Sequence, residues 1–146
     1  MLCILAGSCR SQKKDSQSNN NFEQTQKNGV NYFFGRWILK ERKYSEGNSK
    51  KVYPLHECEK KYTLNFIKEN KKAYLTKNYS TGKNCEIKSN SDKFLISVSE
   101  SSFTYFDLDL KRNEQYKILS KNRFSILDEE ILDGEITEIE DVYERL

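Results

Sequence analysis

The chain has 146 residues and a mass of 17.3 kDa, which is enough for one domain with a short tail. Hydrophobic residues make up 36% of the chain and charged residues 32%, and no apolar run approaches the roughly 18 residues that a membrane-spanning helix needs. The single histidine, His56, excludes zinc hydrolase sites with several histidine ligands and permits a serine triad only around itself. We therefore expect a binding or structural protein without a cofactor or a catalytic metal, and not an enzyme.

The N-terminus predicts export and lipid attachment. Residues 1–7 form a short apolar run, and small residues stand directly before Cys9. The segment Leu5-Ala6-Gly7-Ser8-Cys9 resembles the lipobox of bacterial lipoprotein signal peptides. The resemblance implies a signal peptide remnant over 1–8, a lipidated Cys9, and anchoring to the bacterial cell envelope, at the outer membrane. The alternative is an apolar start that frays or packs against the domain.

A polar segment follows this cysteine. Residues 10–28 are rich in Ser, Gln, Asn and Lys, and Phe22 is the only large apolar residue among them. Such a composition buries too little surface to offset the entropy of ordering it. We expect residues 9–28 to carry the lipid and act as a flexible tether, and residues 29–146 to form the domain.

Alternating apolar and polar residues predict an all-β domain. The period of two residues that marks a half-buried strand recurs along the body of the chain. The expected strands are 37–40, 62–67, 72–79, 94–98, 104–110, 116–120 and 124–126, with polar turns at 68–71, 99–102 and 111–114. Short strands at this spacing favour an antiparallel sandwich or barrel. The segment 45–57 is expected to be a long loop.

The last segment is ambiguous. Ile136, Ile139, Val142 and Tyr143 recur at helical spacing, although a strand also accommodates them. We predict a strand because a barrel needs its last strand to pair with its first, and a short helix is the alternative.

The charges are unevenly distributed. The whole chain is formally +3, yet residues 128–146 carry −8 and residues 1–127 carry +11. Such a contrast can steer an anionic partner, although alternating Lys and Glu on solvated strands produces the same totals.

The Lys-Tyr clusters at 60–62 and 71–74 would suit single-stranded nucleic acid. We expect no nucleic-acid partner because the N-terminus predicts export.

The domain contains two cysteines, Cys58 and Cys85. In an exported protein they are expected to form a disulfide, which would stabilise the fold by about 3 kcal/mol. Two alternatives remain: free buried thiols, and a zinc site that includes His56. We expect His56 itself to be exposed in the loop.

Gly35-Arg36-Trp37, after a run of aromatic residues, resembles the Gly-x-Trp signature of lipocalins. The resemblance covers residues 29–146 and is greatest to the short lipocalin-like domains of bacterial lipoproteins. It implies an antiparallel up-and-down β-barrel of about eight strands. It also implies that Trp37 closes one end of the barrel and that Arg145 packs on it, a cation–π contact of about 0.5–2 kcal/mol.

The interior of such a barrel is filled by side chains or holds one small ligand. The candidate pocket residues are Tyr62, Leu64, Phe66, Phe94, Ile96, Phe106 and Leu108. The resemblance implies a monomer that carries a small hydrophobic ligand beneath the 45–57 loop, which would act as a lid. The alternative is a core filled by these same side chains, in a structural or protein-interaction domain without a ligand.

Overall fold

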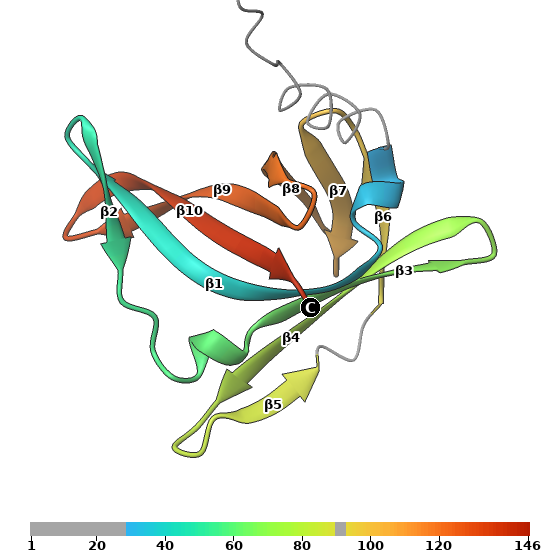
Figure 1. The fold of residues 1–146 in the computed structure, drawn as a ribbon, viewed down its shortest axis with the longest axis horizontal. Coiled ribbons are helices and arrows are strands. Elements are labelled where there is room, and N and C mark those ends of the chain that lie inside the picture. The colour runs from blue at the N-terminus through green and yellow to red at the C-terminus, as the bar shows by residue number, and fades with distance from the viewer. Residues whose placement is uncertain (1–28, 90–92) are drawn as a thin grey trace, which may run out of the picture.

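The computed structural model describes residues 29–89 and 93–146, and these residues form an all-β fold (Figure 1). The predicted signal peptide remnant, Cys9 and the tether lie outside the described residues. Within the described part, no helix is long and apolar enough to cross a membrane. In chain order the elements are η1 (Gly29–Tyr32), β1 (Gly35–Glu46), β2 (Ser49–Tyr53), η2 (Glu59–Lys61), β3 (Thr63–Glu69), β4 (Lys72–Thr81), β5 (Glu86–Ser89), β6 (Phe94–Val98), β7 (Ser102–Asp107), β8 (Leu110–Ser120), β9 (Arg123–Leu132) and β10 (Glu135–Arg145).

Eight of the strands in the described ranges close into an antiparallel barrel. The hydrogen-bonded order is β10-β9-β8-β7-β6-β4-β3-β1, and β10 pairs with β1 to complete the circle. β2 extends the wall beside the second half of β1, and β5 does the same beside the second half of β4. The predicted barrel class is confirmed, and the last segment is a strand that pairs with the first one.

Turn chemistry explains two of the hairpins. Asn70 and Lys71 join β3 to β4 with φ angles of +48° and +65°, within the segment expected to turn. Asp133 and Gly134 join β9 to β10 with φ angles of +52° and +86°. Both pairs occupy the left-handed region that a two-residue hairpin turn requires, where Asn, Asp and Gly are favoured.

Two expected connections are wrong. The segment 45–57 is not a continuous loop, because Ser49–Tyr53 pairs with β1 as strand β2. The turn expected at 111–114 lies inside β8, and the chain turns instead at 108–109, where Leu108 has a φ of +55°. The polar residues at 111–114 therefore belong to a strand, in which Lys111, Arg112 and Asn113 are exposed and Glu114 is half-buried.

Aromatic side chains fill the half of the interior next to η1, which we call the closed end. Phe33 and Trp37 are fully buried there. The Phe33 ring lies 4.7 Å from the ring of Tyr116 and 5.2 Å from that of Phe124, and Trp37 lies 4.8 Å from Phe124. Edge-to-face arrangements of this kind are the favoured geometry for aromatic pairs. The closed half of the barrel is therefore a packed core.

Candidate functional site

Arg145 and Trp37 meet at the closed end. The Cζ atom of Arg145 lies 4.1 Å from the centre of the Trp37 ring, and the two residues are direct partners between β1 and β10. The guanidinium also donates hydrogen bonds to the carbonyl oxygens of Phe34, at 2.7 Å, and Tyr32, at 2.5 Å. Trp37 Nε1 donates to the Phe33 carbonyl at 2.6 Å. These contacts fasten the segment that includes η1 across the end of the barrel.

Gly35 permits this approach. Its φ of +122° is unfavourable for residues with a side chain, and a Cβ atom there would lie 3.1 Å from Arg145 Nη1. The glycine of the Gly-x-Trp pattern therefore has a local physical reason, which is the close contact between the first residue of β1 and the guanidinium of Arg145. The closed end is therefore a structural clamp, in which the guanidinium of Arg145 joins β10 to the segment before β1.

Arg145→Ala is expected to lower the free energy of unfolding by about 2 kcal/mol, because two carbonyl oxygens lose a charged donor. We also expect the fluorescence of Trp37 to shift to the red as water reaches the ring. Urea denaturation followed by tryptophan emission measures both effects. Arg123→Ala is the matched control, since the Arg123 ion pairs are 3.7 and 3.8 Å long and partly exposed, and should cost less than about 0.5 kcal/mol. Equal losses for the two variants would contradict the clamp.

The opposite end, which we call the open end, contains a cavity of about 310 Å³. Side chains from β1, β3, β4, β8, β9 and β10 line it. Its aromatic and aliphatic part includes Tyr62, Leu64 and Tyr143, and its charged part consists of Arg42, Lys77, Glu114, Asp128, Glu130 and Asp141. The expected apolar pocket is thus replaced by one in which apolar walls meet charged groups.

Two networks of charged side chains organise this cavity. Arg42 binds both carboxylate oxygens of Asp141, at 2.6 and 2.8 Å, and reaches Glu59 at 3.3 Å. On the facing wall, Lys77 Nζ donates to the Tyr105 hydroxyl at 2.5 Å and to Glu114 at 3.1 Å. Bidentate and charge-assisted hydrogen bonds are the strong ones, so these side chains are held in place.

The titration behaviour of these groups follows from their burial and hydrogen bonds. The hydrogen bond to Asp141 raises the pKa of Arg42, so its charge is permanent. Burial, together with the hydrogen bond to Glu114, raises the pKa of Tyr105. Burial also raises the pKa of Tyr143. Both tyrosines therefore remain protonated at physiological pH, and the Tyr105 hydroxyl can donate to Glu114 at 2.6 Å.

The structure separates the seven residues predicted to line a pocket. Four of them are buried, namely Leu64, Phe66, Phe94 and Ile96, and Tyr62 is half-buried. The open-end cavity is lined by Tyr62 and Leu64, whereas Phe66 and Phe94 lie in the packed core.

Phe106 and Leu108 are wrongly placed by the sequence prediction. Their side chains are 65% and 88% exposed, and the inward positions of β7 belong to Phe103 and Tyr105. Apolar residues occur on both faces of this strand, so alternation cannot choose the register. Phe103 packs 5.7 Å from the ring of Phe66, and the Tyr105 hydroxyl satisfies the buried network, so this pair occupies the interior.

The charged residues of the cavity were not recognised from the sequence. Lys77 follows Ala73 and Leu75 at the two-residue period, and Asp128 follows Phe124 and Ile126. A charged residue that continues an inward-facing apolar series is the signal that could have identified them.

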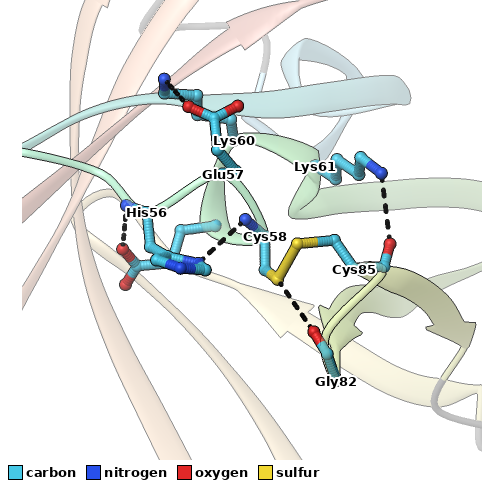
Figure 2. The surroundings of a disulfide bond; sticks show 8 residues. His56, Glu57, Cys58, Lys60, Lys61, Gly82 and Cys85 are labelled. Carbon is cyan, nitrogen blue, oxygen red and sulfur yellow. Dashed lines mark hydrogen bonds and ion pairs between the residues drawn. A yellow bond between two sulfur atoms is a disulfide. The ribbon is translucent and has the colours of Figure 1, made fainter.

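The predicted disulfide joins Cys58, beside η2, to Cys85, before β5. Figure 2 shows its surroundings, in which Lys61 Nζ donates to the Cys85 carbonyl at 3.2 Å and the Cys58 amide donates to His56 Nδ1 at 3.2 Å. His56, Cys58 and Cys85 have their potential ligand atoms within 4.8 Å of one another. The two sulfur atoms are bonded to each other and are not thiolates, so this group does not fit a zinc ion.

Comparisons with known proteins identify no family. No family model matches the chain, and no curated protein does either. Among solved structures, the chain is similar to a bovine odorant-binding protein, a deswapped triple mutant, at 10% sequence identity and a TM-score of 0.43. The similarity covers 79% of this chain and 74% of that one.

Proposed function

We propose that this chain is a lipid-anchored binding protein of the bacterial cell envelope, whose barrel holds a small amphiphilic ligand in the open-end cavity. The observation that carries the ligand proposal is the cavity itself, because a space of about 310 Å³ opens beside a packed aromatic core. Ligand pockets begin at about this size and combine apolar walls with a few fixed polar groups.

The lining indicates which ligand chemistry would fit. Tyr62, Leu64 and Tyr143 offer apolar surface, while Lys77 and Glu114 present hydrogen-bonding groups that their own network holds in place. A wholly apolar ligand would remove water from these charged groups without replacing its hydrogen bonds, which is unfavourable. A ligand with an apolar body and one polar end avoids this cost.

The anchoring proposal rests on the N-terminal sequence. Leu5-Ala6-Gly7-Ser8-Cys9 resembles a lipobox, and a polar segment separates it from the barrel. The disulfide between Cys58 and Cys85 is compatible with an oxidising compartment outside the cytosol.

Native mass spectrometry of the full chain, extracted with detergent from host membranes, tests both parts. The expected chain lacks residues 1–8, carries lipid on Cys9, and releases a small molecule when it is unfolded. A lipidated chain with no released mass would favour an interaction domain without a ligand. A chain that retains residues 1–8 without lipid would contradict the anchoring.

A pair of variants then locates the ligand. Asp128→Trp should fill the cavity and weaken binding of the neutral dye N-phenyl-1-naphthylamine by about tenfold or more, because its side chain lines the cavity. Glu129→Trp is the matched control, since this exposed neighbour undergoes the same change in charge and a similar increase in volume but does not line the cavity. Fluorescence titration measures both affinities. Equal dye binding by the two variants would exclude the open-end cavity as the site.

A further inference from the structure

A row of apolar side chains crosses the outer wall of the barrel. Ile67 on β3 is the direct partner of Tyr74 on β4, and Tyr74 is the direct partner of Leu95 on β6. Phe106 on β7 continues the row and lines the same groove as Leu95. Leu95 is 52% exposed and Phe106 65% exposed. Large apolar residues gathered on one face mark an interaction site more often than isolated ones do.

The groove arises because β6 and β7 separate. These strands pair only at Ser97↔Thr104 and Val98↔Phe103, whereas β7 pairs with β8 along its whole length. Beyond those two pairs, a groove of about 560 Å³ opens between Leu95 and Phe106. It is larger than the open-end cavity and lies on a different face.

Lysines surround this apolar surface. Lys71 and Lys72 line the groove, and Lys111 is the direct partner of Phe106 across β7 and β8. Lys93 Nζ lies 4.9 Å from the centre of the Tyr74 ring and pairs with Glu69, which neutralises the acidic side chain at this edge. The surface therefore combines exposed Leu and Phe side chains with a border of lysine side chains.

The described chain begins beside this groove. Val30, in η1, lines it, and the predicted tether that starts at Cys9 joins the barrel at Gly29. A lipid on Cys9 would thus connect to the barrel next to the groove, and a flexible tether of this length would keep the groove within roughly 25 Å of the bilayer on average. A tether of this kind raises the effective concentration of the second contact, so a weak affinity is sufficient.

We propose that the Leu95–Phe106 groove, with its surrounding lysines, docks the barrel onto an anionic lipid surface. Leu and Phe side chains enter the interface between lipid headgroups and acyl chains, while the lysine stems lie along it with their ammonium groups at the phosphates. Each lysine near an anionic surface strengthens binding about fivefold. The proposed anchoring gives this docking its setting, but the docking surface itself belongs to the barrel.

Vesicle binding by an unlipidated chain tests the proposal separately from the anchor. Full-length protein with Cys9→Ser is mixed with vesicles of phosphatidylglycerol and phosphatidylethanolamine, or of phosphatidylcholine alone, and the bound fraction is measured by sedimentation. We expect binding to the anionic vesicles that weakens as salt is added. The double variant Leu95→Ser/Phe106→Ser should bind these vesicles more weakly, by about tenfold or more. The double variant Lys71→Gln/Lys72→Gln should also reduce binding.

The matched control is Ile87→Ser/Ile131→Ser, because these side chains are 64% and 74% exposed and do not line the groove. All variants share residues 1–28, so any contribution of that segment is the same in each. In a second measurement, a tryptophan introduced by Phe106→Trp should be quenched by brominated lipid, whereas one introduced by Ile131→Trp should not.

Equal binding by the groove variant and its control would overturn the proposal, and so would equal binding to both kinds of vesicle. Dimerisation that depends on Leu95 and Phe106, without vesicle binding, would assign the groove to a protein partner instead. None of these results depends on whether Cys9 is lipidated, which the mass of the membrane-extracted chain decides.

Discussion

Phe33→Ala is expected to lower the free energy of unfolding by about 4 kcal/mol, the largest effect of any substitution considered for this barrel. The Phe33 side chain has no exposed surface and lies among the rings of Phe66, Phe103, Tyr116 and Phe124. Its removal leaves a cavity that four aromatic rings cannot all close. Urea denaturation should show a lower midpoint with an unchanged slope.

Phe106→Ala is the control for this prediction, because it deletes the same side chain from an exposed position and should cost less than about 1 kcal/mol. If Phe33→Ala does not fold at 25 °C, Phe33→Leu gives a smaller loss of about 1–2 kcal/mol that remains measurable. A larger loss from Phe106→Ala than from Phe33→Ala would mean that the register of β7 is reversed.

Removal of the disulfide is the second large effect. Cys58→Ser/Cys85→Ser is expected to destabilise the domain by about 3 kcal/mol, since the bridge spans a sequence separation of 27 residues and restricts the unfolded chain. The bridge also holds the chain before η2 against the chain before β5, so we expect local opening to increase there. Thermal denaturation and hydrogen exchange of residues 56–61 and 82–86 measure these effects.

A background of Cys3→Ser/Cys9→Ser makes this test specific, because it leaves Cys58 and Cys85 as the only cysteines. In that background, reduction should add two hydrogens to the intact mass and lower the melting temperature. A mass and melting temperature that do not respond to reduction would show that the bridge does not form.

The sequence predicts the barrel more reliably than its interior. In β3 and β6 most apolar residues share one face, with Leu64 and Phe66 in β3 and Phe94 and Ile96 in β6, so alternation identifies the buried side chains although Leu95 lies on the outer face. β7 carries Phe103 and Tyr105 on one face and Phe106 on the other, and only contacts with distant strands choose between them. The error at Phe106 and Leu108 therefore has a physical origin, since the deciding partners lie on β3, β4 and β8.

Contacts between distant strands also explain why the sequence did not predict the charged cavity. Arg42 and Asp141 are separated by 99 residues, and Lys77 and Glu114 by 37. Each looks like an ordinary surface charge in its own segment, and their roles arise only when the barrel closes. No local signal in the sequence links β1 to β10. Only the resemblance to a family pattern predicts that Gly35, Trp37 and Arg145 lie together.

The pairing of β1 with β10 also governs the order in which this protein can be completed. Trp37 and Arg145 are partners across that seam, so the circle cannot close until residues near 145 are available. A chain can emerge N-terminus first from a ribosome or a translocation channel. One edge of β1 then stays unpaired until nearly all of the chain has emerged. Contacts this distant in sequence also form slowly. Until the final strand arrives, the edge of β1 that pairs with β10 therefore has no partner from its own barrel.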